Sequence, residues 1–346
     1  MTTSKEQLKR AVLWQPESDN KARCYLCNFR CLIPEGKYGH CAVRQNVNGT
    51  LRSLNYDSVC AANPDPIEKK PLFHFQPGTR SFSIACPGCN FQCTFCQNWQ
   101  ISQMALKYHQ LEGEPIPPEK IVAAAQRSSC CSIAYTYTEP TIFMELCEET
   151  GKLAKQQGLT NVFVSNGYMT KEAVDFSAEW LDGINIDLKA FSDKYYKDLC
   201  NARLQPVLET IKYIAKETDI WVELTTLIVP DQNDSDDELK ALAEFIANEA
   251  GPEVPWHISR FFPAYEMDGG SATPPETLER AMEIGKQAGL KYIYVGNLPG
   301  SNAESTFCPS CGEKVIDRIS YIIRRNNIKH GACPSCSEKI PGFELG

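Results

Sequence analysis

The sequence of 346 residues contains no apolar run that approaches the ~18 residues of a membrane-spanning helix. Its first residues also lack the apolar segment that a signal peptide requires. We therefore expect a cytoplasmic protein that has no membrane partner.

Positive charge is also scarce, because 35 lysines and arginines face 43 aspartates and glutamates, which gives a formal net charge of −8. Proteins that bind nucleic acid without sequence preference usually carry a basic surface stripe, so a nucleic-acid partner is not expected. The length suits one large domain of barrel size or two to three smaller domains.

Cysteine, in contrast, is abundant, with 17 residues. In a reducing compartment such a number indicates metal sites rather than disulfides. Eleven of them form three clusters: Cys24, Cys27, Cys31 and Cys41; Cys89, Cys93 and Cys96; Cys308, Cys311, Cys333 and Cys336. The other six are scattered and are expected to be small buried side chains: Cys60, Cys86, Cys130, Cys131, Cys147 and Cys200.

The central cluster has the spacing C-x3-C-x2-C and follows a short apolar segment, Ser81–Ala85, that reads as a buried strand. A cluster of four irons and four sulfides normally takes four thiolates. Three thiolates would hold three irons and leave the fourth open to a small molecule. Cys86 and Cys89 also resemble a zinc knuckle, but this knuckle would share Cys89 with the triad, and we favour the triad.

The two outer clusters each predict a four-thiolate metal site. In the first, the Cys24–Cys27 pair is completed by Cys31 and Cys41 for zinc or an iron–sulfur cluster, the alternative being four reduced cysteines in a loop-rich segment. The last cluster consists of two C-P-S-C knuckles, typical of a small metal ribbon with zinc or a single iron. Residues 1–23 are expected to form a helix or arm, and Asn48-Gly49 the turn of a hairpin.

From residue 81 onward, segments typical of strands alternate with segments typical of helices. The expected strands are Ser81–Ala85, Ile133–Tyr137, Val162–Ser165, Ile184–Leu188, Trp221–Ile228, Trp256–Arg260 and Tyr292–Val295. The expected helices are about 118–129, 140–158, 170–180, 205–217, 235–249 and 275–289. This alternation predicts an α/β fold with parallel strands and right-handed crossovers. Six or seven units favour a complete or partial barrel, although a doubly wound sheet fits the same alternation.

Polar side chains follow most of these strands, where the chemistry of such barrels collects. The segments concerned are 136–140, 165–168, 187–189, 223–226, 257–260 and Gly296-Asn297. For any single residue a helix cap or a surface position is the alternative, and Asp187 with Lys189 could be a simple charge pair on one strand face. The charged run Asp65–Leu72 reads as an extended connector, and such runs are usually solvated.

The cysteine triad after the first strand resembles the signature of radical S-adenosylmethionine (SAM) enzymes. Nearly the whole chain resembles the branch called the AmmeMemoRadiSam system radical SAM enzyme, and its core is similar to pyruvate formate-lyase activating enzymes. The matching segments are 24–31, 65–72, 89–99, 135–140, 165–167, 187–189, 296–297 and the terminal knuckles. The resemblance implies a partial (β/α)6-type barrel at residues 76–300, between a cysteine-rich module and connector at 1–75 and a ribbon-like module at 301–346.

The resemblance also implies that Cys89, Cys93 and Cys96 ligate a [4Fe–4S] cluster whose open iron binds SAM. The residues that it implies for SAM binding are Phe95, Thr138, Glu139, Ser165, Asn166, Asp187, Lys189 and His257. Thr138-Glu139-Pro140 looks like the family's Gly-Gly-Glu-Pro loop, without the glycines.

The function so implied is reductive cleavage of SAM to methionine and a 5′-deoxyadenosyl radical, which abstracts hydrogen from a substrate. Flavodoxin or ferredoxin would be the reductant, and the family name implies Memo-like and AMMECR-like partner proteins. One alternative is an activase that installs a glycyl radical on a partner enzyme. A third hypothesis is a noncatalytic iron–sulfur or zinc protein that acts as an electron carrier or scaffold.

Overall fold

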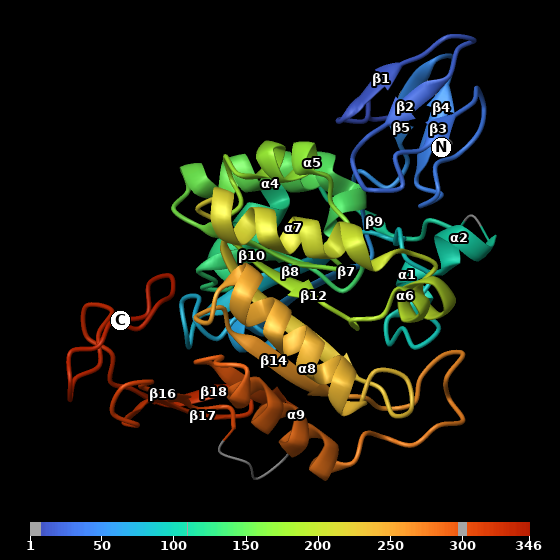
Figure 1. Ribbon diagram of the computed structural model, residues 1–346. Helices are drawn as coiled ribbons and strands as arrows, with labels where there is room; N and C mark the ends of the chain where they lie inside the picture. Colours follow the sequence, from blue (N-terminus) through green and yellow to red (C-terminus); the bar gives the residue numbers. More distant parts are fainter. Residues whose placement is uncertain (1–7, 109, 297–302) are drawn as a thin grey trace. The chain divides into compact units, whose positions relative to one another are not determined.

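A computed structural model describes residues 8–108, 110–296 and 303–346 (Figure 1). The chain divides into two compact units. The first comprises the chain up to Pro64 together with Ser81–Asp182, and the second comprises Asp65–Arg80 together with Gly183–Gly346. The module boundaries predicted from the sequence remain predictions.

The first unit contains three parallel strands with helices between them. The strands are β8 (Arg80–Ala85), β10 (Ser132–Tyr135) and β11 (Thr160–Ser165), with β10 paired to both of the others. The helices are α1 (Trp99–Ser102), α2 (Met104–Tyr108), α3 (Pro118–Arg127), a 3-10 turn (Pro140–Phe143), α4 (Met144–Gln156) and α5 (Lys171–Ser177). Residues 132–135 are all buried, as expected for a central parallel strand covered on both faces.

The core of the first unit is organised around Trp180, which is fully buried and stacks edge-on with Tyr135 and Phe163. The side chain of Asn161 donates hydrogen bonds to the carbonyls of Gly151 (3.1 Å) and Trp180 (3.1 Å) and accepts one from the hydroxyl of Tyr135 (3.0 Å). A buried amide with all its partners fixes one arrangement of α4 against β10 and β11.

The N-terminal part of the first unit consists of short strands. These are β1 (Trp14–Pro16), β2 (Ala22–Cys24), β3 (Leu32–Ile33), β4 (Arg44–Val47), β5 (Thr50–Ser53) and β6 (Ser58–Val59), and β6 pairs with β9 (Glu114–Pro115). The pairs β1–β2, β2–β3, β4–β5 and β6–β9 are antiparallel. β7 covers Ala61–Pro66. The predicted hairpin is confirmed, because β4 and β5 pair across Asn48-Gly49. The expected helix or arm is wrong for the described part of residues 1–23, where β1 pairs with β2 instead.

The second unit carries four parallel strands in the order β12, β13, β14 and β15 (Gly183–Asp187, Trp221–Ile228, Trp256–Arg260 and Ile293–Gly296). Its helices are α6 (Asp193–Cys200), α7 (Leu204–Glu217), α8 (Asp236–Phe245), a π-helical turn (Ile246–Ala250) and α9 (Pro275–Gln287), and a 3-10 turn covers Ile67–Lys69. Ser192 and Ser235 cap α6 and α8 by accepting hydrogen bonds from the first helical turn.

The C-terminal end of the second unit is an antiparallel ribbon of β16 (Thr306–Phe307), β17 (Lys314–Ile319) and β18 (Ile322–Asn326). Its apolar side chains share one core with Phe73, Tyr292 and Tyr294. The remaining members of this core are Cys308, Val315, Ile316, Ile328, Cys333, Ile340 and Leu345. The ribbon therefore packs on β15 and on residue 73 instead of building a core of its own.

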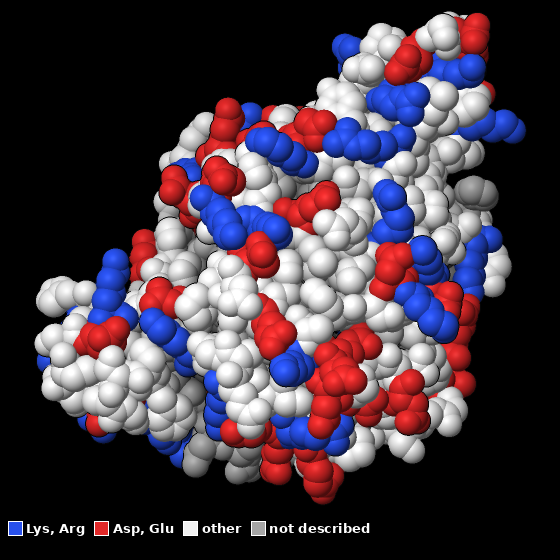
Figure 2. All heavy atoms as spheres, in the orientation of Figure 1, with Lys and Arg blue, Asp and Glu red and all other residues white. Residues whose placement is uncertain are grey.

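The α/β class and the seven predicted strands are confirmed, with bounds that differ by at most two residues. None of the helices in the described ranges combines the length and apolarity needed to cross a membrane. Figure 2 shows basic and acidic side chains intermixed over the visible face.

Gly151 offers a direct test of this packing, since a Cβ atom there would lie 2.5 Å from the ring of Trp180. We predict that Gly151→Ala lowers the free energy of unfolding by about 1–2 kcal/mol, because overpacking outweighs the gain in helix propensity. Urea denaturation measures the change. Gln156→Ala, at an exposed position of the same helix, should be nearly neutral, and a Gly151→Ala protein as stable as that control would contradict the packing.

Candidate active site

The three cysteines of the central motif lie on the loop between β8 and α1. Cys93 is buried, while Cys89 and Cys96 are partly exposed. The backbone N–H of Phe91 donates to the sulfur of Cys89 (3.3 Å), and the hydroxyl of Ser102 lies 3.2 Å from the sulfur of Cys96. Burial raises the pKa of Cys89 well above its usual range, and charges on Glu139, Cys93 and Cys96 raise it further. Such closely placed thiols need a cation to become thiolates together.

Glu139 joins the ends of β10 and β11. One carboxylate oxygen accepts hydrogen bonds from the backbone N–H of Thr141 (3.1 Å), its hydroxyl, and the hydroxyl of Ser165 (2.8 Å). The other oxygen accepts the backbone N–H of Asn166 (2.8 Å). Burial raises the pKa of Glu139, whereas these donors act in the opposite direction. This carboxylate therefore fixes the segment after β11 against the segment after β10.

Asn166 extends the same network to the cysteine loop. Its side-chain amide donates to the side-chain oxygen of Asn90 at 2.7 Å and lies 3.9 Å from the sulfur of Cys89. The Asn90 side chain is fully buried, and its own amide nitrogen has no hydrogen-bond partner within the described ranges. An unpaired buried donor is costly, so this nitrogen is suited to an anionic group beside the cysteines. Sequence reasoning missed Asn90, although it directly follows the first cysteine of the motif.

The loop that precedes Glu139 contains a strained residue. Tyr137 has φ = +67°, a left-handed conformation that glycine adopts readily and larger residues adopt rarely. The carbonyl of Tyr137 accepts a hydrogen bond from the side chain of Asn98 (2.9 Å), and the hydroxyl of Thr138 donates to the carbonyl of Cys86 (2.7 Å). The loop thus adopts a conformation suited to glycine, held by hydrogen bonds on both sides. Phe95, also predicted for this site, is buried between the second and third cysteines.

In the second unit, Asp187 and Lys189 follow β12 and form an ion pair of 2.9 Å. Asn233 holds the backbone here by donating to the carbonyl of Lys189 at 2.6 Å. The two side chains therefore form the charge pair that the sequence offered as an alternative. Their binding of SAM remains a prediction. Gly296 ends β15, but Asn297 lies outside the described residues.

His257, on β14, donates from Nε2 to the carboxylate of Glu223 on β13 at 2.7 Å. The same carboxylate accepts the backbone N–H groups of Phe73 (2.9 Å) and His74 (2.8 Å) and the indole N–H of Trp221 (2.9 Å). Burial alone would raise the pKa of Glu223, but His257 and the other partners outweigh it and the pKa is lowered. His257 is therefore held by a buried carboxylate.

His74 lies at the centre of a directed hydrogen-bond chain that the sequence did not reveal. Its Nδ1 must donate to the carbonyl of Pro341 (2.7 Å), so its Nε2 accepts from the hydroxyl of Tyr294 (2.6 Å). Tyr294 in turn lies 2.9 Å from the hydroxyl of Thr306, which accepts a hydrogen bond from Arg318 (2.6 Å). This chain links the 71–76 segment, β15 and the ribbon.

The charged run that reads as a solvated connector is partly buried, which corrects the sequence-based expectation. Glu68 accepts the N–H of Gly78 (2.8 Å) and lies 3.9 Å from the guanidinium of Arg318. Lys70 is buried in a pair with Asp65 (2.7 Å), and burial lowers its pKa to about 8. The counter-charge of Lys70 lies within the same run, whereas that of Glu68 lies on the ribbon, outside any local sequence window, so the pattern alone did not show that Glu68 is buried.

The four terminal cysteines lie together, as the sequence predicts for a metal site, and the identity of the metal stays a prediction. Their sulfurs all lie within 4.8 Å of one another. The pairs Cys308–Cys336 and Cys311–Cys333 are 3.5 and 3.7 Å apart. Four sulfurs at this spacing can hold one tetrahedral metal ion. Of the N-terminal cysteines, Cys24, Cys27 and Cys41 are buried and Cys31 is partly exposed.

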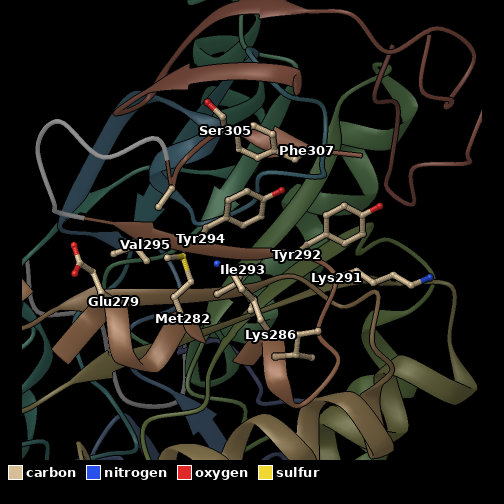
Figure 3. A pocket seen from close by; sticks show the side chains of 12 residues that line it. Glu279, Met282, Lys286, Lys291, Tyr292, Ile293, Tyr294, Val295, Ser305 and Phe307 are labelled. Carbon is tan, nitrogen blue, oxygen red and sulfur yellow. The ribbon is translucent and has the colours of Figure 1, made fainter. Parts of the chain in front are cut away.

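Two cavities lie apart from these residues. One of about 440 Å³ is formed by α9, β15 and the ribbon, with walls that include Met282, Tyr292 and Tyr294 (Figure 3). Another of about 800 Å³ is in the first unit beside the cysteine loop, lined by Cys60, Pro87 and Trp99 among others. Among the described residues, none that the sequence predicts as ligands lines either cavity.

The sequence profile of the radical SAM superfamily matches residues 83–246. Uncharacterized protein MJ0808 of Methanocaldococcus jannaschii is 46% identical over 311 residues, covering 90% of this chain and 92% of that protein. The chain belongs to the radical SAM superfamily. This radical SAM protein is also 23% identical over 240 residues to pyruvate formate-lyase 1-activating enzyme of Escherichia coli, covering 63% of this chain and 93% of that enzyme.

Among solved structures, SuiB of Streptococcus suis bound to S-adenosylmethionine aligns with a TM-score of 0.50 at 13% identity. The alignment covers 67% of this chain and 53% of SuiB, so the chain matches about half of SuiB's length. This likeness supports the fold alone. Membership of the superfamily establishes an enzyme of SAM-dependent radical chemistry.

His74 gives the radical SAM protein a predicted pH dependence. Burial lowers its pKa to about 4, against partly opposing effects that include the charge of Glu223. The unfolded chain takes up this proton near pH 6.5, so stability falls as pH drops from about 6.5 to 4. Between pH 7.5 and 5.5 we expect a loss of about 1 kcal/mol that His74→Asn abolishes. Urea denaturation at both pH values tests this, with a substitution of the exposed His330, His330→Gln, as the control. If the free energy of unfolding of His74→Asn falls between the two pH values as much as that of the unchanged protein, the prediction is refuted.

The terminal cysteine site predicts a metal content. Cys336→Ser should remove about one metal ion per chain, because three thiolates bind a tetrahedral ion much more weakly than four. Elemental analysis of anaerobically purified protein measures the loss and identifies zinc or iron. Cys131→Ser, at an exposed position outside the clusters, should keep the full content, and equal metal in both variants would argue against the site.

Proposed function

We propose that this enzyme holds a [4Fe–4S] cluster through Cys89, Cys93 and Cys96 and cleaves SAM reductively. The observation that carries the proposal is the network in which Asn166 reaches both Glu139 and the cysteine loop. It gathers the residues after three parallel strands around three thiols. The unpaired amide of Asn90 fits the same interpretation, because an iron–sulfur cluster and a SAM carboxylate are both anionic.

Within the first unit, we assign Phe95, Thr138, Glu139, Ser165 and Asn166 to SAM. Glu139 already accepts four hydrogen bonds, so its first role is to set the loops that carry the other residues. An ammonium group of SAM would compete with the hydroxyls of Thr141 and Ser165 for its oxygens. Buried carboxylate oxygens with charged partners form the strongest hydrogen bonds, which favours the ammonium.

Within the second unit, the resemblance leads us to propose Asp187, Lys189 and His257 as SAM-binding residues. Glu223 already occupies Nε2 of His257, so a ribose hydroxyl would be met by Nδ1. The pair with Glu223 fixes the ring orientation, as a neighbouring carboxylate does in other functional histidines. Lys189 is neutralised by Asp187 and would have to release this carboxylate for a second partner.

A cluster held by Cys89, Cys93 and Cys96 would supply the one electron needed to split SAM into methionine and a 5′-deoxyadenosyl radical, which would abstract hydrogen from the substrate. Flavodoxin or ferredoxin is the proposed source of that electron. The protein's own contribution is to orient SAM through Glu139, Ser165 and Asn166 and to keep water away through their burial. The flanking four-cysteine sites are proposed to hold zinc or additional iron.

The substrate is proposed to be either a molecule handled together with Memo-like and AMMECR-like proteins or a glycine residue of a partner enzyme. The similarity to an enzyme named as an activator of pyruvate formate-lyase favours the second. A stable glycyl radical, seen by electron paramagnetic resonance of a candidate partner, would distinguish it from the first. Absence of SAM binding by reconstituted protein would instead favour an iron–sulfur or zinc carrier or scaffold.

We predict that Cys93→Ala abolishes 5′-deoxyadenosine formation and removes about four irons per chain, because two thiolates cannot retain the cluster. Anaerobic assay with dithionite and SAM measures the first effect, and elemental analysis the second. Cys131→Ser serves as the matched control. Undiminished 5′-deoxyadenosine from Cys93→Ala would overturn the assignment.

A further inference from the structure

The segment that carries Ser165 and Asn166 is attached on its far side to the N-terminal cysteine loop. The backbone N–H of Asn28 donates to the carbonyl of Tyr168 at 2.9 Å, and its side chain donates to the carbonyl of Met169 at 2.6 Å. Cys27 and Met169 form an antiparallel β-bridge. The turn between the second and third N-terminal cysteines is thus hydrogen-bonded to the continuation of the proposed SAM loop.

Thr170 closes this attachment. Its hydroxyl donates to the carbonyl of Tyr25 at 2.7 Å, and its backbone N–H donates to the carbonyl of Leu26 at 3.3 Å. The same hydroxyl oxygen accepts the N–H of Ala173 and caps α5. Both carbonyls lie between Cys24 and Cys27, inside the C-x2-C pair. Three consecutive residues, 168–170, therefore contact the cysteine pair and its turn.

Aromatic rings continue the connection to the cysteine triad. Phe29 stacks on His40 with ring centroids 3.8 Å apart and contacts Tyr168 at 4.9 Å. Tyr168 then meets Phe91, between the first two triad cysteines, at 5.2 Å. The row begins inside the N-terminal cluster and ends on the central loop, so it connects the cysteine turn to Phe91 beside the triad.

The four N-terminal cysteines lie in one loop region, although they are not among the described side chains whose sulfurs all lie within 4.8 Å of one another. Cys24, Cys27 and Cys41 are buried, and the backbone N–H of Cys24 bonds to the carbonyl of Cys31 at 2.9 Å. The N–H of His40 donates to the sulfur of Cys31 at 3.4 Å.

Arg44 supplies a fixed positive charge beside these sulfurs. Its guanidinium lies 3.7 Å from the sulfur of Cys24, donates to the carbonyl of Val12 at 2.7 Å and pairs with Glu145 of α4. Arg44 and Glu145 are both almost fully buried. A divalent ion with four thiolates carries a net charge of −2, and a buried guanidinium compensates part of it. The pair also anchors the cluster to the helix that follows Glu139.

We propose that Cys24, Cys27, Cys31 and Cys41 hold a metal centre, zinc or iron, whose occupancy fixes residues 165–170 and thereby sets the affinity for SAM. The effect on SAM affinity rests on the proposed function, whereas the coupling between the metal and residues 165–170 does not. Residues 24–41 are mostly loops around the two-residue strand β3, and in so short a segment a bound metal would add order. Without it, the carbonyls and amides that hold residues 168–170 lose their fixed positions.

The test compares amide hydrogen exchange of residues 165–170 in protein free of SAM. In Cys27→Ser we expect loss of the N-terminal metal and exchange faster by about tenfold or more in this segment. Asn28→Asp keeps the four thiols but replaces the amide donor to Met169, so it should retain the metal and still accelerate exchange. Cys311→Ser removes a metal from the second unit and should leave this segment unchanged. Elemental analysis of each variant assigns zinc or iron.

Binding of SAM is then measured by anaerobic equilibrium dialysis. We expect a rise in the SAM dissociation constant of about tenfold in Cys27→Ser, with the irons of the Cys89 site retained, as for other supporting groups around a site. The proposal would be overturned if amide exchange in Cys27→Ser equals that of the wild-type protein. It would also be overturned if Cys27→Ser contains as much metal as the wild-type protein. Faster amide exchange in Cys27→Ser with an unaltered affinity for SAM would refute the effect of the metal on SAM binding. Failure of wild-type protein to bind SAM would instead refute the proposed function and leave the metal–loop coupling standing.

Discussion

Burial of a carboxylate that forms no ion pair with any described lysine or arginine is the constraint on which the first unit depends. Glu139 is almost completely removed from water, and its ionised form is stable only if donors surround it. Those donors come from Thr141, Ser165 and Asn166, on loops far apart in the sequence. The loops after β10 and β11 therefore have one favourable arrangement, and this arrangement turns the Asn166 side chain toward the cysteine loop.

The second unit follows the same rule with a different carboxylate. Glu223 accepts two backbone N–H groups from residues 73 and 74, an indole N–H and the imidazole of His257. It thereby attaches the 71–76 segment to the parallel strands, and His74 passes the connection to Tyr294 and the ribbon. A single ionised group thus orients a candidate ligand residue and positions the C-terminal module, so loss of either function would disturb the other.

The sequence predicted the parts of the structure that local patterns determine. Buried runs such as 132–135 and the amphipathic helices follow from periodicity, and the C-P-S-C knuckles predicted the clustered terminal sulfurs. It did not predict that Glu68 is buried, because its partner Arg318 lies elsewhere in the fold. Nor did it show that Tyr137 adopts a left-handed conformation, since tertiary hydrogen bonds, not residue preference, impose it.

The two outer cysteine modules are attached to different parts of the chain, and this difference separates their roles. Cys308 and Cys333 lie in an apolar core with Tyr294, and Arg318 of the ribbon donates hydrogen bonds to Thr306 and to the carbonyl of Phe73. The N-terminal cysteines are attached through hydrogen bonds of Asn28 and Thr170, which weaken steeply with distance and angle. A change at a metal bound by the N-terminal cysteines would therefore reach residues 168–170 first, whereas a change at a terminal metal would reach β15 and residue 73.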